Sequence, residues 1–238
     1  MKYLVPPLNQ TLSWYLAMEE YVAVNLDKFI ANSDENGVFF TWIVSPTVIY
    51  GRHQVLENEV DLEFCKEHGI QIVQRKSGGG CVYADRGNLM LSYIVKKDTH
   101  NAQEVFQLFL DIVAEVLRNL GLDAVKTEHN DILVDGLKVS GNACYTLKNA
   151  IIVHGTMLYN EDFDMMQRAI TPTKEKLEKH GVKSVRQRVV NLADKLDNNL
   201  ICNINALSDF LVKKLCVSQC ELTQYDLEQI STLEKGNY

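Results

Sequence analysis

The sequence predicts a mixed α/β fold in one domain that spans residues 1–238. Two observations predict it. Stretches with apolar residues at helical spacing alternate with short runs rich in β-branched and aromatic residues, and an Asp-Gly turn joins two of those runs. A chain of 238 residues suits a single core, because mixed α/β enzymes often reach this length without dividing. No internal repeat, low-complexity tract or change of composition marks a linker.

Composition narrows the classes of partner and the compartment. Hydrophobic residues make up 46% of the chain and charged residues 23%, values typical of a globular protein. A net charge of -7 argues against nucleic-acid binding over a broad surface. No apolar run approaches the ~20 residues of a membrane-spanning helix, so no membrane partner is expected. The N-terminus lacks a signal-peptide pattern, so the six cysteines are interpreted as thiols of a cytoplasmic protein.

The first half of the chain predicts helices and strands in alternation. Apolar residues at helical spacing predict helices, runs of β-branched and aromatic residues predict strands, and a glycine at the C′ position ends a helix. The predicted elements are a helix over 14–29, strands over 38–44 and 48–50 joined by a tight turn, a helix over 57–68 ended by Gly69, and strands over 70–73 and 89–95.

The second half carries clearer local signals. Asn101 and Glu104 have the spacing of a capping box, and an apolar stripe follows as far as Gly121, which predicts a long helix. Asp135-Gly136 suits the positive φ angles of a type I′ turn, so a hairpin is predicted there. The other predicted elements are a strand over 150–158 and helices over 163–169, 204–215 and 225–233, the last capped by Thr223 and Asp226.

Three consecutive glycines, Gly78, Gly79 and Gly80, follow the segment Arg75-Lys76-Ser77. Glycine lets backbone N–H groups approach an anion closely, and the two cations balance its charge. The motif is neither a Walker A loop nor a GxGxxG loop, because Cys81-Val82-Tyr83 and then a strand follow where a helix would begin. A flexible turn is the alternative, but the flanking Arg and Ser favour a phosphate-binding loop.

Lys138 lies just after the predicted hairpin turn and is followed by Ser140-Gly141-Asn142. A lone Lys on a strand is usually only solvated. Here the glycine suggests a close backbone approach to a ligand, and an ammonium can bind a carbonyl oxygen and a phosphate oxygen together. Asp131, in Asn130-Asp131, either contacts a divalent ion such as Mg²⁺, which takes one or two carboxylates plus phosphate oxygens, or forms part of a turn.

Other polar residues allow more than one interpretation. His154 either donates to a ligand or is a core histidine with its hydrogen bonds satisfied. Arg186 and Arg188 form a basic cluster that is solvated, or contacts phosphate or an acidic partner. Cys81 and Cys144 allow a different reaction, in which a thiolate activated by His154 carries an acyl group as a thioester. That interpretation is the weaker one, since no sequence feature lowers the pKa of either thiol.

Five blocks of sequence, in order, resemble the lipoate-protein ligase family. The first block is Arg75 to Tyr83 with Asp85 and Gly87-Asn88, which matches the family pattern of Arg, Ser, three Gly, a small residue, Val and an aromatic residue, then Asp-x-Gly-Asn. The resemblance covers nearly the whole chain. The other blocks are Asn130-Asp131-Ile132, Asp135-Gly136 with Lys138 and Ser140-Gly141-Asn142-Ala143, His154-Gly155-Thr156 with Leu158, and Gly181-Val182-Lys183-Ser184-Val185-Arg186.

The resemblance implies a fold and a reaction. The fold would be the biotin/lipoate-protein ligase catalytic domain, which is similar to class II aminoacyl-tRNA synthetases and has a mixed, largely antiparallel sheet flanked by helices. The reaction would join lipoate to ATP as lipoyl-AMP and then transfer the lipoyl group to a lysine of a lipoyl domain. Those domains belong to 2-oxoacid dehydrogenase acyltransferases and to the glycine-cleavage H protein.

The resemblance also implies site residues. Lys138 matches the essential lysine of the family, which holds the acyl carbonyl and the phosphate without becoming covalently bound. Asp131 would contact Mg²⁺. The positions implied to contact lipoyl-adenylate are Arg75, Ser77, Gly78, Gly79, Gly80, Cys81, Val82, Tyr83, Asn88, Lys138 and His154.

Two departures from the family pattern keep alternatives open. Cys144-Tyr145 stands where some members place an Arg, and this chain stops at Tyr238 where well-known members continue into a C-terminal accessory domain. We therefore expect that domain to be absent, and a separate accessory protein to be a candidate partner. The alternative functions are a lipoyl or octanoyl transferase that uses preformed lipoyl-AMP or a cysteine thioester, and a non-catalytic protein that binds lipoyl domains.

Overall fold

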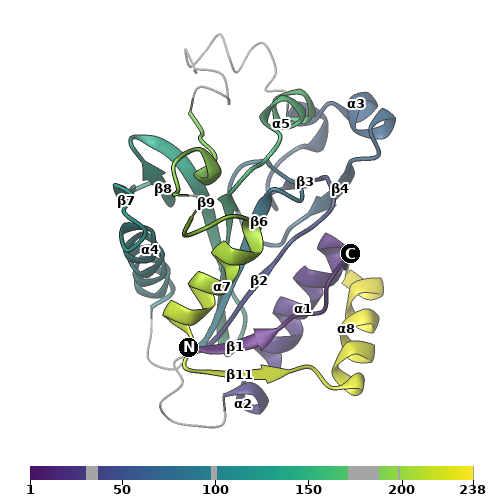
Figure 1. The fold of residues 1–238 in the computed structure, drawn as a ribbon. Coiled ribbons are helices and arrows are strands. Elements are labelled where there is room, and N and C mark those ends of the chain that lie inside the picture. The colour runs from purple at the N-terminus through teal and green to yellow at the C-terminus, as the bar shows by residue number, and fades with distance from the viewer. Residues whose placement is uncertain (31–36, 98–100, 171–187, 198, 238) are drawn as a thin grey trace.

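The structure is a computed structural model that describes residues 1–30, 37–97, 101–170, 188–197 and 199–237. The strands of its main sheet are β1 (Lys2–Val5), β2 (Val38–Trp42), β6 (Asn88–Lys96), β7 (Ala124–Lys126), β8 (Asp131–Val134), β9 (Leu137–Thr146), β10 (Ala150–Leu158) and β11 (Ser218–Glu221). Their order is β11-β1-β2-β6-β10-β9-β8-β7 (Figure 1). Neighbours from β2 to β7 are antiparallel, whereas β1 is parallel to β2 and β11. The predicted mixed, largely antiparallel sheet is confirmed.

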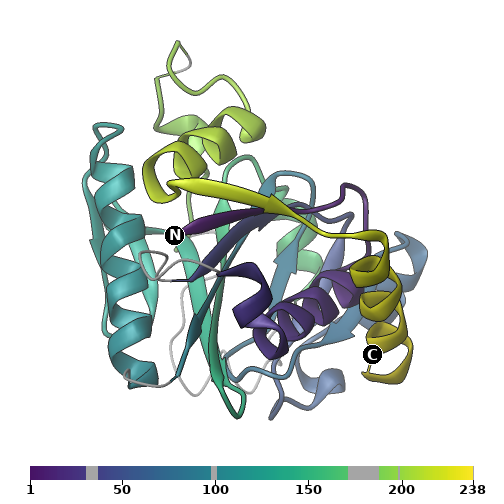
Figure 2. The same cartoon turned by 90° about the horizontal axis from the view of Figure 1, so that it is seen from below.

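Helices cover both faces of this sheet. They are α1 (Leu12–Val24), α2 (Leu26–Phe29), α4 (Ala102–Arg118), α7 (Ile204–Leu215) and α8 (Gln224–Asn237). Helices α4 and α7 pack on one face, α1 and α2 pack on the other, and α8 lies against α1 (Figure 2). All nine residues of β10 are buried, because this strand is central and covered on both faces. The main core therefore lies on both sides of β6 and β10.

A second, three-stranded sheet lies beside the main one. Its strands are β3 (Thr47–Tyr50), β4 (Gln71–Gln74) and β5 (Val82–Ala84), in the order β4-β3-β5, with α3 (Leu62–Glu67) and α5 (Phe163–Ala169) packed against it. The predicted pairing of strands 38–44 and 48–50 across a tight turn is wrong. β2 has neighbours on both sides in the main sheet, so the chain crosses to the second sheet at Pro46, whose carbonyl oxygen accepts from the Gln71 N–H.

The predicted helix over 14–29 is divided in the structure. α1 ends at Val24 and α2 begins at Leu26, so Asn25 alone lies between them. The side chain of Asn25 explains the break, because its Nδ2 donates to the Tyr21 carbonyl oxygen at 2.9 Å and caps the end of α1. A short polar side chain that bonds to nearby backbone competes in this way with helix continuation.

The predicted helix over 57–68 is shorter than expected. A 3₁₀ turn, η1 (Leu56–Asn58), precedes it, and α3 begins only after Asp61. Asp61 is the N-cap, because its Oδ1 accepts from the Phe64 N–H at 2.9 Å. Gly69 follows the helix with a φ of +63°, which confirms the predicted C′ glycine.

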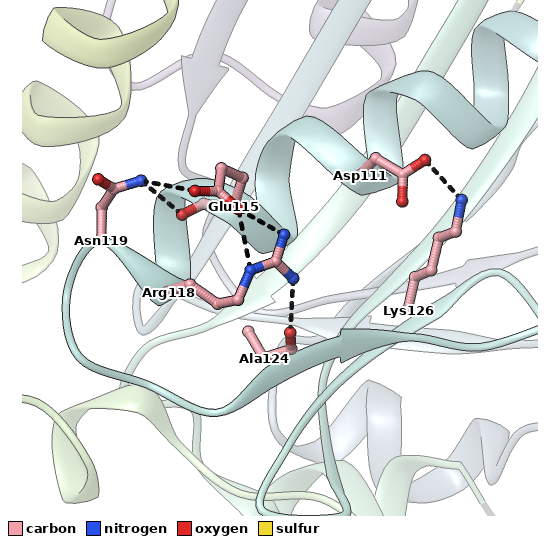
Figure 3. Close-up of polar contacts among 6 residues, drawn as sticks. All are labelled: Asp111, Glu115, Arg118, Asn119, Ala124 and Lys126. Atoms are coloured by element: carbon pink, nitrogen blue, oxygen red, sulfur yellow. Dashed lines mark hydrogen bonds and ion pairs between the residues drawn. The ribbon is translucent and has the colours of Figure 1, made fainter.

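Helix α4 confirms the prediction from the capping residue and the apolar stripe. Asn101 caps it by accepting from the Gln103 N–H, and its stripe from Val105 to Leu117 is buried against the sheet. On its outer side, polar contacts join α4 to the edge strand β7 (Figure 3). Arg118 Nη1 donates to the Ala124 carbonyl oxygen at 2.9 Å, which occupies a backbone acceptor that an edge strand would otherwise expose.

The predicted hairpin and the later elements are also confirmed. Asp135 and Gly136 have φ angles of +51° and +78°, as a type I′ turn requires. β10, α5 and α7 have the predicted bounds, and α8 begins at Gln224, one residue earlier than predicted. Strands β1, β5, β7 and β11 were not predicted, because each of these short segments contains at most one β-branched residue. The block 181–186, with Arg186, lies outside the described residues.

No helix among the described residues combines the length and the apolar character that crossing a membrane requires.

Helix α8 is attached to α1 and α2 through one buried carboxylate. Asp226 is fully buried and accepts hydrogen bonds from Tyr21, Lys28 and Thr223. Thr223 Oγ1 in turn accepts from the Asp226 N–H, so the predicted cap is confirmed. Burial alone would raise the pKa of Asp226, but hydrogen bonds from Lys28, Tyr21 and Thr223 outweigh burial and hold that pKa well below its usual range.

The substitution Asp226→Asn tests this attachment, because it removes the charge and keeps the size. A carboxyl whose folded-state pKa is lowered adds stability above its unfolded pKa of about 3.9, and this stability is lost as the pH falls through the folded value. We expect the variant to be less stable than the parent by about 3 kcal/mol at pH 7, and the difference to shrink at pH 3. Urea unfolding at both pH values measures it, and equal differences at the two would contradict the account.

Candidate functional site

A cavity of about 290 Å³ opens between the two sheets, where β9 and β10 meet the loop that follows β4. One part of its wall is apolar and comes from α1, β2, β3, β5 and β6. These apolar residues are Leu12, Leu16, Trp42, Ile49, Val82 and Met90. The rest of the wall is polar and contains the residues around Lys138 and two residues of the loop Gly78 to Gly80, which we call the glycine loop. The cavity therefore offers an apolar slot that continues into a polar, positively charged region.

Two glycines of the central strands let side chains approach the backbone closely. A Cβ at Gly155 would lie 1.9 Å from Asn142 Oδ1, and a Cβ at Gly141 would lie 2.8 Å from Lys138 Nζ. Asn142 is held by Nδ2, which donates to the Asn130 carbonyl oxygen at 3.1 Å and to Ser140 Oγ at 3.0 Å. A side chain at either glycine position would displace these groups, so glycine shapes this wall of the cavity.

Arg75 organises the glycine loop. Its Nη2 donates to the Gly78 and Gly80 carbonyl oxygens at 2.8 and 2.7 Å, and its Nη1 donates to the Ile49 carbonyl oxygen at 3.0 Å. Its Nε donates to Ser77 Oγ and to the Gly78 carbonyl oxygen. The Arg75 residue is 6% exposed, and burial lowers the pKa of its guanidinium. In this structure Arg75 is thus committed to the loop carbonyls, which fixes the path of the loop.

Lys138 is held through both its backbone and its side chain. Its N–H donates to the Arg188 carbonyl oxygen at 2.8 Å, and its carbonyl oxygen accepts from the Val190 N–H at 3.0 Å. Its Nζ lies 2.8 Å from Asp131 Oδ1, and both side chains line the cavity. Arg188, predicted as part of a basic cluster, therefore contributes a backbone contact that orients Lys138.

A buried chain of hydrogen bonds runs behind the cavity wall. Glu19, on α1, is fully buried, and its Oε2 lies 2.9 Å from His154 Nδ1. His154 Nε2 lies 2.7 Å from Ser77 Oγ, which is the atom that Arg75 Nε contacts. The side chain of Glu19 is therefore connected to Arg75 through two intermediate side chains.

The same chain continues on the other side of Glu19. Ser92 Oγ donates to Glu19 Oε1 at 2.6 Å, and Trp42 Nε1 donates to Ser92 Oγ at 2.8 Å. Both Ser92 and Trp42 are buried. We call these six residues the buried chain: Trp42, Ser92, Glu19, His154, Ser77 and Arg75.

Most of the predicted site residues meet at this cavity. Those that line it are Arg75, Gly79, Gly80, Cys81, Val82, Asp131, Lys138 and His154. Both ring nitrogens of His154 have protein partners, which agrees with the interpretation as a core histidine with its hydrogen bonds satisfied. His154 also lines the cavity, and donation to a ligand stays a prediction.

Four predicted site residues do not line the cavity. Ser77 and Tyr83 are buried, and Gly78 lies in the loop next to Arg75. Asn88 is fully buried; its Nδ2 donates to Glu161 Oε2, and its Oδ1 accepts from the Met157 N–H. These residues support the walls of the cavity from behind, and direct contact with a ligand stays a prediction for them.

Sequence reasoning missed Glu19, Trp42 and Ser92. A signal for Glu19 was present, because residues 14–18 are five consecutive apolar residues and cover the whole circumference of a helix turn. A glutamate in the next turn of such a helix is expected to be buried, and a buried carboxylate needs partners. The partners themselves come from β2, β6 and β10, which only the fold brings together.

The two cysteines considered as nucleophiles have the wrong electrostatic surroundings. Burial raises the pKa of the Cys81 thiol to about 12, and burial also raises the pKa of Cys144. Cys81 lines the cavity and Cys144 does not. Both groups are therefore protonated thiols near neutral pH, which are poor nucleophiles.

Comparison with known proteins agrees with this geometry. Lipoate–protein ligase 1 of Staphylococcus aureus is 37% identical over 227 residues, which are 94% of this chain and 66% of that protein. This chain thus spans about two thirds of the length of that relative.

Solved structures have the same fold. A bi-partite lipoate protein ligase from Thermoplasma acidophilum, studied with its E2 lipoyl domain, matches with a TM-score of 0.84 and 27% identity over 98% of this chain and 91% of that one. A lipoate-protein ligase A bound with ATP matches with a TM-score of 0.83 and 25% identity over 98% of this chain and 94% of that one.

The match to a family model decides the assignment. The model of the lipoyl protein ligase A/B catalytic domain matches residues 12–215, which contain both sheets, the glycine loop, Lys138 and the buried chain, apart from the terminal strands β1 and β11. The chain therefore belongs to the lipoyl protein ligase A/B catalytic domain family.

Proposed function

We propose that the protein is a lipoate-protein ligase, which joins lipoate to ATP as lipoyl-AMP and transfers the lipoyl group to a lysine of a lipoyl domain. One observation carries the proposal: an apolar slot, a glycine loop and Lys138 all line a single cavity. An acyl-adenylate has the same three parts, namely an apolar chain, a nucleotide phosphate and a reactive junction.

The apolar slot suits the acyl chain. Leu16, Trp42 and Met90 line it with buried, uncharged side chains that can pack against an apolar acyl chain. Burial of each CH₂ group in such a slot is worth about 0.8 kcal/mol, so a chain of medium length gains several kcal/mol. The relative from Staphylococcus aureus is named a lipoate ligase, which favours lipoate as the acyl substrate.

The glycine loop suits the nucleotide phosphate. Because Arg75 draws in the Gly78 and Gly80 carbonyl oxygens, the N–H groups of the loop are left for another acceptor. Within the described part of the chain, the N–H groups of Gly78 to Gly80 donate to no protein acceptor. Backbone N–H groups arranged in this way form a common anion-binding site. One of the similar structures is bound with ATP.

Lys138 suits the reactive junction. Its ammonium is paired with Asp131 and lines the same cavity as the apolar slot and the glycine loop. In the first half-reaction the lipoate carboxylate attacks the α-phosphorus of ATP and pyrophosphate leaves. In the second, a neutral lysine amine of the acceptor attacks the acyl carbon, AMP leaves with the bonding electron pair, and the new amide nitrogen loses a proton. Lys138 stabilises the negative charge that develops on the carbonyl and phosphate oxygens.

Mg²⁺ is proposed to enter with the phosphates of ATP. Asp131 is the only acidic residue among the described residues that line the cavity, and no group of three potential metal-binding side chains occurs in the described ranges. These residues fit an ion that phosphate oxygens hold mainly and one carboxylate assists, which is the usual mode of Mg²⁺ binding at a nucleotide. The ion would screen the charge of the phosphates.

The proposed acceptors are lipoyl domains of 2-oxoacid dehydrogenase acyltransferases and the glycine-cleavage H protein. The similar ligase from Thermoplasma acidophilum is bi-partite and was studied with its E2 lipoyl domain, which supports a lipoyl domain as acceptor and a second polypeptide as a candidate partner. The cytoplasmic location that the sequence predicts stays a prediction.

Replacing Lys138 by Met tests the proposal. With an apo lipoyl domain, lipoate, ATP and Mg²⁺, the parent is expected to lipoylate the acceptor, and Lys138→Met is expected to lose at least about 100-fold in rate, since an electrostatic contact to the developing charge is removed. Mass spectrometry of the acceptor measures the product. Both proteins are assayed with and without an added accessory polypeptide from a bi-partite system.

The same assay with preformed lipoyl-AMP separates the two half-reactions. A parent that transfers only from lipoyl-AMP is the transferase of the alternative interpretation. Full activity of Lys138→Met in both assays would overturn the proposed role of the lysine, and an inactive but lipoyl-domain-binding parent would support the non-catalytic alternative.

The thioester alternative is tested by the reactivity of the cysteines. Because burial raises the pKa values of Cys81 and Cys144, both are expected to react with iodoacetamide at pH 8 at least about tenfold more slowly than the exposed Cys202. Peptide mass spectrometry over a time course measures the three rates. Rapid labelling of Cys81 or Cys144, or a thioester on either after incubation with an acyl-carrier substrate, would favour the alternative.

A further inference from the structure

The buried chain connects parts of the cavity wall that do not touch each other. Trp42, in the apolar slot, and Arg75, under the glycine loop, are its two ends, and His154 lines the cavity between them. The other three members, Ser92, Glu19 and Ser77, do not line the cavity. An influence of Glu19 on a ligand must therefore pass through its neighbours.

The two donor-only ends of the buried chain, and the requirement that every buried hydrogen has an acceptor, together assign a direction to each hydrogen bond in it. The Trp42 indole nitrogen and the Arg75 guanidinium are donors only. Ser92 Oγ accepts from Trp42, so its own hydrogen points to Glu19 Oε1. Ser77 Oγ accepts from Arg75 Nε, and among the described residues His154 Nε2 is the only contact of Ser77 Oγ that can accept its hydrogen, so we assign that hydrogen to His154 Nε2.

The middle of the chain follows from these two ends. Since His154 Nε2 accepts from Ser77, the ring proton is on Nδ1 and is donated to Glu19 Oε2. The Glu19 carboxylate thus accepts from both sides, and no hydrogen in the chain lacks an acceptor. An acceptor-only group is needed at this position, and an ionised carboxylate is one.

The chain also balances charge inside the protein. Glu19 and Arg75 are the charged members, and both are buried, so each would be costly without compensation. The carboxylate polarises His154 and Ser77 toward itself, which strengthens the acceptor that Arg75 Nε meets. Arg75 in turn holds the Gly78 and Gly80 carbonyl oxygens. The orientation of the loop N–H groups therefore depends on a carboxylate on α1.

We propose that Glu19 is a positioning residue for nucleotide binding: through His154 and Ser77 it fixes Arg75, and through Arg75 it fixes the glycine loop in the form that accepts a phosphate. This inference rests on the proposed function, because it assumes that the loop binds a nucleotide.

The substitution Glu19→Gln changes the hydrogen bonding of the buried chain with the smallest change of shape. If the amide oxygen faces His154, the amide NH₂ faces Ser92 and the Ser92 hydrogen loses its acceptor. If the amide oxygen faces Ser92, the NH₂ faces His154, the ring proton moves to Nε2 and the Ser77 hydrogen loses its acceptor. In either orientation one buried hydroxyl is left unsatisfied, although the shape of the side chain is unchanged.

The test measures binding of α,β-methylene-ATP to the full chain by calorimetry. Glu19→Gln is expected to weaken binding at least about tenfold, although Glu19 lines no part of the cavity. The matched control is Asp226→Asn, which neutralises another fully buried carboxylate that neither lines the cavity nor belongs to the buried chain. The control is expected to bind as the parent does. Unchanged binding by Glu19→Gln would overturn the inference.

A double-mutant cycle distinguishes positioning from a general loss of structure. If Glu19 acts through Ser77, then Glu19→Gln has little further effect on nucleotide binding in a Ser77→Ala background, because the connection is already broken. Additive effects of the two substitutions would contradict the inference. Ser92→Ala, a smaller change at the far end of the chain, provides a second variant if Glu19→Gln does not fold.

The ring proton of His154 provides a measurement that needs no variant. Nitrogen-15 NMR of the parent protein is expected to show the tautomer with the proton on Nδ1, and the tautomer with the proton on Nε2 would overturn the direction of the chain. A parent that has the expected tautomer but does not bind α,β-methylene-ATP would count against the proposed function, whereas the assigned directions of the hydrogen bonds in the buried chain would still hold. Failure of the two claims is thus distinguishable.

Discussion

The buried guanidinium of Arg75 is the constraint around which the site is built. A buried cation needs acceptors for its N–H groups, and the protein supplies two loop carbonyls, the Ile49 carbonyl oxygen and Ser77 Oγ to Arg75. Satisfying Arg75 therefore folds the glycine loop, and the loop carbonyls that face inward leave the N–H groups of the loop for a ligand. The countercharge is Glu19, which reaches Arg75 through His154 and Ser77.

The central strands provide the other half of the site. Gly141 and Gly155 remove side chains where Lys138 and Asn142 need the space, and the backbone of Lys138 is fixed by Arg188 and Val190. The Lys138 ammonium therefore extends from a strand whose backbone is fixed, and its ion-pair partner is Asp131. A phosphate and an acyl carbonyl together attract the Lys138 ammonium more strongly than the half-buried Asp131 carboxylate does alone. The ion pair between Lys138 and Asp131 is therefore suited to break when an acyl-adenylate binds.

Local signals in the sequence were sufficient for much of the fold. Caps such as Asn101, turns such as Asp135-Gly136 and the C′ glycine Gly69 act within a few residues, and the structure confirms them. The same reasoning failed where a distant partner decides the outcome. β2 and β3 are adjacent in sequence but belong to different sheets, and the short strands β1 and β11 exist because they pair with each other across the chain termini.

The site shows the same division. The glycine run, Lys138, Asp131 and His154 stand out as unusual residue types at turns and strand ends, and the cavity brings them together. Glu19 could not be assigned a partner from the sequence, because its contacts lie on β6 and β10, far along the chain. For Arg75, a cation before a glycine run suggests direct contact with phosphate; the structure adds its hydrogen bonds to the loop and Ile49 carbonyl oxygens, and the contact with phosphate stays a prediction.

A crystal structure of the protein with a sulfamoyl analogue of lipoyl-adenylate, which cannot transfer its acyl group, tests the central claim most directly. The account predicts the acyl chain among Leu16, Trp42 and Met90, the sulfamoyl group at the N–H groups of the glycine loop, and Lys138 Nζ bonded to the acyl carbonyl rather than to Asp131. An analogue bound elsewhere, or Lys138 still paired with Asp131 and out of contact with the carbonyl, would contradict it.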